Sequence, residues 1–186
     1  MDDGAFASLW NHLHGLPLSQ RTTLVLRNTR LALSHEDVHC PFPALNLILD
    51  RCRVDATADL AEYFPDLEVL IACKATCLNG LQQFDWLPTS VRHIHILQSD
   101  FDNSQADSAS IATFPALESL TFTWLQPDTT NEPGSPVADD ADPLSNLRRF
   151  VEATVVAPLC TFKYLRSTKA PEDALADAMA DLGLDS

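Results

Sequence analysis

Glycine is scarce in this chain, with five residues among 186, and the motifs that mark the large enzyme families are missing. The sequence contains no G-x-x-x-x-G-K-S/T phosphate loop, no G-x-G-x-x-G fingerprint, no G-x-S-x-G elbow and no H-E-x-x-H pair. Because a phosphate cradle needs glycine where the backbone approaches the ligand, we do not expect one here. We predict no catalytic residue, no cofactor and no bound metal.

Long hydrophobic runs are also missing. No stretch of eighteen or more apolar residues occurs, and Asp2 and Asp3 stand where a secretory signal would carry basic residues. Basic residues are few throughout, since 12 Lys and Arg face 26 Asp and Glu, for a formal net charge of -14. That charge opposes the counterion release that drives most nucleic-acid binding. We therefore expect a soluble intracellular protein, cytoplasmic or nuclear, with no nucleic-acid and no membrane partner.

The cysteines are odd in number and include no C-x-x-C pair that would indicate a zinc ribbon or a redox site. They are Cys40, Cys52, Cys73, Cys77 and Cys160. Four of the five lie in or beside apolar runs, where a thiol behaves as a small buried hydrophobe. We expect all of them to be reduced.

An internal repeat of the form (F/L)-P-x-L-x-x-L-x-L is present along most of the chain. Its copies begin at Phe42, Phe64, Leu87, Phe114 and, less regularly, Asp142, and a looser copy begins at Leu16. The spacing from one copy to the next is nearly regular and lengthens toward the end of the chain. After the proline of each copy comes a short alternating run, which predicts a strand with one buried face. These runs fall at residues 24–26, 47–49, 67–70, 91–96, 117–122 and 147–151.

One strand and one helix-like or irregular return segment form a unit that cannot bury its apolar side until a neighbouring copy stacks on it. The chain resembles the leucine-rich repeat family over residues 16–153, most clearly at 91–96 and 117–122, and residues 42–52 look like the repeats of F-box-associated members. No F-box is visible. The resemblance implies an α/β solenoid with a parallel β-sheet on the concave side and short helices or irregular segments on the convex side. The alternative is an unrelated α/β domain in which F-P-x-L starts successive strands.

This interpretation divides the chain into one repeat domain, residues 1–165, and an acidic C-terminal helix or tail, residues 166–186. The domain would contain about six irregular repeats and a mobile acidic loop over residues 127–142. It would begin with a capping helix that carries Phe6, Leu9, Trp10 and Leu13 at helical spacing. Pro171 and Gly183 mark the start and stop of the second helix. Either helix is a cap or a docking peptide for a partner.

Alternate residues of parallel strands share one face, so the repeats predict a concave binding surface. The row across its middle is Val25, Ile48, Ile71, His95, Thr121 and Val151. An apolar strip of this kind predicts contact with another protein, which we favour, or coverage by the chain's own terminal segment. The predicted partner-binding residues are Val25, Arg27, Ile48, Asp50, Ile71, Cys73, His93, His95, Thr121, Thr123, Arg149 and Val151.

The predicted function is a non-catalytic protein–protein interaction module, such as a substrate-recognition or scaffold fragment. The alternative from another class is a metal-dependent or cysteine-dependent enzyme centred on Cys73, His93 and His95, since both histidines project from the same side of one strand. A third possibility is a degenerate or truncated relative of a longer receptor. The pairs His12/His14 and His35/His39 are interpreted as ordinary surface histidines.

Overall fold

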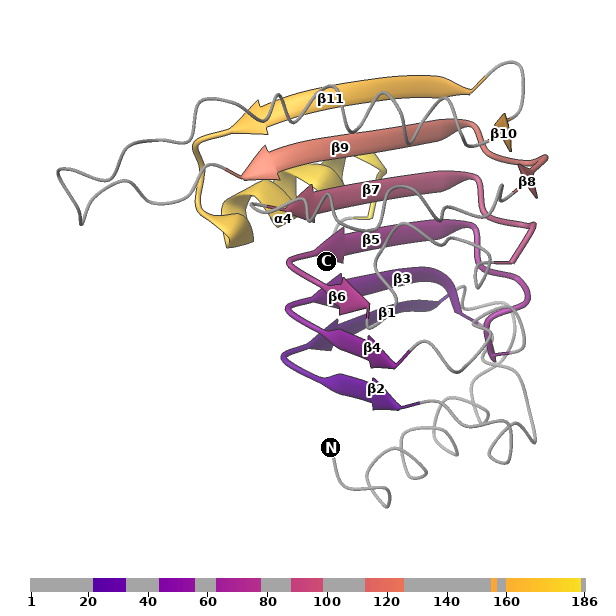
Figure 1. Ribbon diagram of the computed structural model, residues 1–186, viewed down its shortest axis with the longest axis horizontal. Coiled ribbons are helices and arrows are strands. Elements are labelled where there is room, and N and C mark those ends of the chain that lie inside the picture. The colour runs from indigo at the N-terminus through magenta and orange to yellow at the C-terminus, as the bar shows by residue number, and fades with distance from the viewer. Residues whose placement is uncertain are drawn as a thin grey trace, which may run out of the picture.

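The main element of the structure is a six-stranded parallel sheet. A computed structural model describes residues 22–32, 44–55, 63–77, 88–98, 113–125, 155–156 and 160–184. Each strand of the sheet lies beside the next strand of the series along the chain (Figure 1). The six are β1 (Thr22–Arg27), β3 (Ala44–Asp50), β5 (Val69–Cys73), β7 (His93–Gln98), β9 (Ser119–Leu125) and β11 (Thr161–Ser167). The protein is therefore of the α/β class, with one C-terminal helix, as the sequence predicts.

The register of the first five strands follows the sequence repeat. Their aligned positions are Leu24, Leu47, Leu70, Ile94 and Leu120, each paired with the next. The chain between successive aligned positions lengthens slightly toward Leu120, so the strands stay in register while the connections grow. These side chains, together with the side chain two residues later on each strand, form one buried face of the sheet. Its members are Leu24, Leu26, Leu47, Leu49, Leu70, Ala72, Ile94, Ile96, Leu120 and Phe122.

The C-terminal helix is α4 (Pro171–Asp181). Pro171 stands in its first turn, where the missing N–H costs no hydrogen bond, and Glu172 and Asp173 place negative charge at the positive end of the helix dipole. Gly183, with a φ of 67°, follows the last turn. The buried side of the helix consists of Ala174, Leu175 and Ala178. Among the described residues, no helix is long and apolar enough to cross a membrane.

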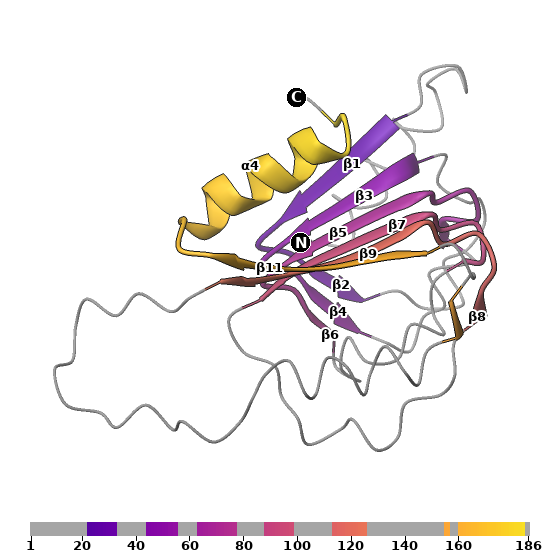
Figure 2. The same ribbon diagram turned by 90° about the horizontal axis from the view of Figure 1, so that it is seen from above.

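The first three strands of the sheet end at corners with the same backbone geometry. Asn28, Arg51 and Lys74 have left-handed φ values of 49°, 54° and 48°. Their amide groups donate to the carbonyl oxygens of Asp50, Cys73 and Leu97 on the next strand, at 2.9, 2.8 and 2.9 Å. Each corner leads into a strand of a second parallel sheet, β2 (Arg30–Ala32), β4 (Arg53–Asp55) and β6 (Thr76–Cys77). Figure 2 shows this second sheet on the side of the main sheet that faces away from α4.

The sixth strand of the main sheet is not the predicted one. The repeat phrase placed it at residues 147–151, whereas β9 pairs with β11, with Phe162 opposite Leu120. Pro158 precedes Phe162 by four positions, as Pro43 precedes Leu47, but β11 lacks the spaced leucines of the other copies. The strand also crosses the boundary that the sequence suggested after residue 165. Before it, β10 (Val155–Val156) pairs in parallel with β8 (Thr113–Phe114).

Several predicted features lie outside the described residues. They are the N-terminal capping helix, the acidic loop over residues 127–142, the run at 147–151 with the candidate residues Arg149 and Val151, and the pairs His12/His14 and His35/His39. All of these stay predictions.

Candidate functional site

The second face of the main sheet is formed by the other set of alternate residues. Backbone pairing places Val25, Ile48, Ile71, His95 and Thr121 in one row across it, in the order that the sequence predicts. The sixth member of the row is Lys163 instead of Val151, because β11 takes the place beside β9. A cation therefore stands at the end of the row where an aliphatic side chain was expected.

The helix α4 lies across the middle of this face (Figure 2). Ile48, Ile71 and Cys73 are 0% exposed and belong to one apolar cluster with Leu175 of the helix. The other members of the cluster are Val69, Leu97, Leu125, Ala174 and Ala178, with Met179, Leu182 and Leu184 packed against it. The chain's own terminal segment thus covers the middle of the apolar row, which agrees there with the second of the two explanations that the sequence allowed. No partner can reach these buried side chains while α4 stays in place.

The remaining predicted face residues divide by exposure. Val25 and Arg27 on β1 are exposed, and His93 is half-buried. Four others are buried, namely Asp50, His95, Thr121 and Thr123. The open part of the predicted surface is therefore its β1 end.

Charged side chains hold the start of α4 against the sheet. Arg51 Nη2 lies 3.0 Å from Glu172 Oε1 in the first turn of α4, and Arg51 Nε lies 3.2 Å from Asp50 Oδ1 at the end of β3. The Asp50 side chain is only 5% exposed, and Arg27 Nε approaches its other oxygen at 3.5 Å. Hydrogen bonding to Asp50 raises the pKa of Arg51 above its ordinary value. A buried carboxylate needs such partners, because an unpaired charge in the interior is strongly destabilising.

An open groove of about 420 Å³ lies between α4 and the carboxyl ends of β1 and β3. Its charged lining consists of Arg27, Asp50, Arg51 and Glu172, and its apolar lining consists of Leu175, Ala176, Met179, Ala180 and Leu184. Val25 lies two positions before Arg27 on the same face of β1 and is 38% exposed. The groove can accept an apolar side chain with a charged group beside it, a combination typical of contacts between proteins.

His93 and His95 project from the same side of β7, but each is bound to a hydroxyl group of β9. His93 Nδ1 lies 2.9 Å from Ser119 Oγ, and His95 Nε2 lies 2.8 Å from Thr123 Oγ1. In the part of the chain that the structure describes, no group of three or more His, Cys, Asp or Glu side chains could hold a metal ion. The histidines therefore serve here as links between neighbouring strands.

Cys73 is held as a buried, protonated thiol. Burial raises its pKa to about 11, and the nearby charge of Asp50 acts in the same direction. Its Sγ donates to the carbonyl oxygen of Pro171 at 3.8 Å, and its pairing partner on β7 is Leu97, not a histidine. Since the thiolate is the reactive form, Cys73 is a poor nucleophile at neutral pH.

Alkylation tests the burial of Cys73 directly. We expect iodoacetamide to label the partly exposed Cys160 at least about tenfold faster than Cys73 in the folded protein. Peptide mass spectrometry of timed samples measures both rates, and a urea-unfolded sample supplies the reference for each cysteine. If Cys73 reacted as fast in the native protein as in urea, α4 would not be covering it.

His95 is 5% exposed, and its pKa is lowered to about 4, chiefly because burial disfavours the charged ring. The negative charge of Asp181 opposes this lowering of the pKa, and the positive charge of Lys163 adds to it. The folded protein therefore keeps the ring neutral, while the unfolded chain protonates it near the ordinary pKa of 6.5.

This difference makes stability depend on pH with a defined sign. Between pH 6.5 and 4 the unfolded chain binds a proton that the folded state does not, so the free energy of unfolding should fall by about 3 kcal/mol as the pH decreases, and this contribution is constant above and below that window. His95→Gln should remove this component, because glutamine does not titrate. Urea unfolding of both proteins across the window measures the difference. Curves with the same pH dependence would contradict a buried neutral His95.

Comparisons with family models, with curated proteins and with solved structures found no match to this chain. Its repeat pattern and geometry are therefore the basis on which a family and a function are proposed.

Sequence reasoning missed the residues outside the repeats that complete the site. Leu175, Met179 and Leu182 stand at helical spacing in the sequence, but that spacing does not indicate which surface they would cover. Glu172 follows Pro171 at the predicted start of this helix, and its pairing with Arg51 has no signal in the sequence. Lys163 was missed because β11 was missed.

Proposed function

We propose that this chain is a non-catalytic protein-binding module built of leucine-rich repeats. Three features support the repeat architecture. The six parallel strands follow chain order, the first five are aligned at nearly constant spacing, and the left-handed corner recurs in the first three copies, at Asn28, Arg51 and Lys74. One strand and one return segment in a short repeated unit is typical of leucine-rich repeats. The main sheet would then be the concave side of a short solenoid.

The partner of this module would dock in the groove between α4 and β1. The observation that carries this proposal is the exposure of Val25 at 38%, whereas Ile48 and Ile71 in the same row are fully covered. In the groove, Arg27 and Arg51 offer exposed side chains and Met179 offers a flexible apolar side chain. Arginine and methionine are enriched at contacts between proteins, because both bury apolar area while adapting to the partner.

Substitutions at Ala176, which lines the groove, and at Val25, which precedes Arg27 by two positions on the same face of β1, test this proposal. Val25→Glu and Ala176→Glu each place a charge on the open surface without disturbing a buried contact, because both side chains are exposed. Quantitative mass spectrometry should show the partner that wild-type protein retains from its native source falling by at least about tenfold with either variant. Ala170→Glu is the matched control, since Ala170 is exposed but does not line the groove. A partner retained equally by all four proteins would contradict docking in the groove.

The metal-dependent or cysteine-dependent enzyme has no comparable support. Cys73 is covered and protonated, and both histidines are engaged with hydroxyl groups of β9. No observation on the described residues favours that function over binding.

A further inference from the structure

The last strand of the main sheet leaves one edge open among the described residues. β11 pairs with β9 and stands at the end of the strand order. Most of its side chains are exposed, including Phe162 at 40% and Leu165 at 42%. In the described part of the chain, the only other large hydrophobic side chain with such exposure is Val25, at the opposite edge. An open edge that carries bulky apolar side chains is a template for an added strand.

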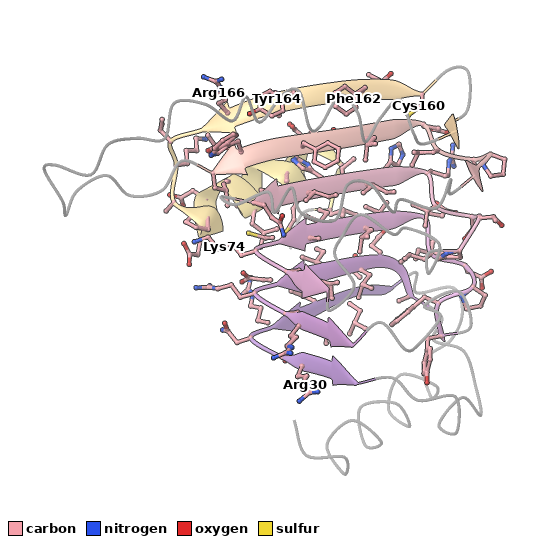
Figure 3. The ribbon with its side chains drawn as sticks, viewed as in Figure 1. Arg30, Lys74, Cys160, Phe162, Tyr164 and Arg166 are labelled. Carbon is pink, nitrogen blue, oxygen red and sulfur yellow. The ribbon has the colours of Figure 1, made fainter. Side chains whose placement is uncertain are left out.

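The backbone of β11 is oriented for such an addition. The N–H of Thr161 donates to the carbonyl oxygen of Glu118 beside β9, at 2.8 Å. In a parallel pair, alternate residues direct their N–H and C=O groups to the same neighbour, so the groups of the intervening residues point to the open side. These intervening residues are Phe162, Tyr164 and Arg166, which Figure 3 shows along the outer strand.

The charge of β11 is opposite to that of the chain as a whole. The strand carries Lys163 and Arg166 and no acid, whereas the full sequence has a net charge of -14. Neither side chain forms an ion pair with a described residue, whereas four other cations of strands and turns do. Those paired cations are Arg27, Arg51, Arg92 and Lys169. Within the described part of the chain, the two cations of β11 are thus available to external carboxylates.

We propose that the β11 edge binds an extended acidic segment of a partner protein by strand addition. The net charge of -14 repels a nucleic acid or an anionic membrane, each with many negative charges, more strongly than a short segment that carries two acids. A second copy of this chain would bring the cations of two β11 strands close together. An added strand in register places apolar residues opposite Phe162 and Leu165, and acids opposite Lys163 and Arg166. The matching pattern is apolar-acid-x-apolar-acid read parallel to β11, or the reverse read antiparallel.

In this arrangement the backbone hydrogen bonds supply affinity and the flanking side chains supply selectivity. The edge lies at the opposite end of the strand order from the groove on β1. The inference therefore goes beyond the proposed function, and it holds whether or not the groove binds a partner.

Fluorescence anisotropy with a short labelled synthetic peptide tests the proposal. The probe carries valines and glutamates in the matching pattern, and the comparison peptide has lysine at each glutamate position. We expect the glutamate peptide to bind at least about tenfold more tightly than the lysine peptide. Arg166→Ala should weaken binding by about threefold by removing one exposed charge pair. Arg166→Pro should weaken it by about another fivefold, because it also removes an N–H that points to the open edge.

Two controls keep this result interpretable. Thermal unfolding shows whether Arg166→Pro folds, and if it does not, Arg166→Glu is compared with Lys74→Glu, which makes the same charge change at an exposed corner away from β11. Only Arg166→Glu should reduce binding. Val25→Glu should leave the affinity for the peptide unchanged. The groove proposal and the edge proposal can therefore be contradicted separately.

Several outcomes would overturn the inference. Equal affinity of the protein for the two peptides would show that its cations do not select acids. Equal affinity of Arg166→Ala and Arg166→Pro for the glutamate peptide would show that the open backbone edge does not bind it. Binding of phosphatidylserine vesicles or of single-stranded DNA with no binding of the glutamate peptide would assign the edge to another class of partner. Self-association that Arg166→Pro abolishes, seen by sedimentation, would assign it to a second copy.

Discussion

Replacing Ile71 by aspartate is expected to unfold the protein. Ile71 is 0% exposed, lies between Ile48 and His95 in the covered row, and packs in the cluster beneath α4. A carboxylate at this position would lie among the apolar side chains of the cluster, beside the neutral ring of His95, and would replace a large apolar side chain. Such a change costs more than about 4 kcal/mol, which is comparable with the whole stability of many domains. Circular dichroism should show an unfolded chain without a cooperative urea transition.

The matched control for this variant lies in the same row. Val25→Asp makes a similar change at an aliphatic position that is 38% exposed, and should cost less than about 1 kcal/mol. A folded Ile71→Asp protein with unchanged thermal stability would show that Ile71 faces solvent. The apolar row would then be a surface open to a partner protein, which is the explanation that the sequence alone favoured.

Replacing Leu175 by aspartate is expected to release α4 from the sheet. Leu175 is 3% exposed and is the largest of the helix side chains buried in the cluster, since the other two are alanines. Loss of its packing and burial of a charge should together cost about 3 kcal/mol. With α4 displaced, the cluster beneath it, which includes Ile48, Ile71 and Leu97, would be exposed to solvent. We expect increased binding of the dye ANS and a lower urea midpoint.

Ala176→Asp is the control for this second variant, because Ala176 is the next residue along α4 and is exposed. It should leave both dye binding and the urea midpoint near the wild-type values. The two variants should also differ at His95, whose pKa should move from about 4 toward its ordinary value only in Leu175→Asp, as water reaches the ring. A Leu175→Asp protein with wild-type dye binding and His95 pKa would contradict the packing of α4 on the sheet.

The strands and their shared face could be predicted because both depend on local sequence. A proline that starts each copy and an alternating run after it are sufficient to define a strand and the side that each residue takes. The predicted row of Val25, Ile48, Ile71, His95 and Thr121 is confirmed by the backbone pairing for this reason. Regular spacing between copies was enough to predict the parallel order of these five strands.

The sixth strand, and the packing of α4 on the sheet, could not be predicted in the same way. β11 places Thr161, Lys163 and Leu165 on the face that α4 partly covers, and it has no repeated leucines that would distinguish it from a loop. The helix α4 was visible as a short apolar stripe, but the surface it covers is decided by tertiary packing between segments far apart in the sequence. Charge pairing between Arg51 and Glu172 likewise joins two distant parts of the chain, and the sequence pattern carries no signal for such a contact.

The chain's own C-terminal helix closes the middle of the aligned apolar row of the parallel sheet. Methyl-labelled protein examined by nuclear Overhauser spectroscopy tests this contact most directly. We expect cross-peaks from the methyl groups of Leu175 to those of at least one of Ile48, Ile71 and Leu97, all members of one buried cluster. Leu175 methyl groups that show cross-peaks only to neighbours within the helix would contradict this packing.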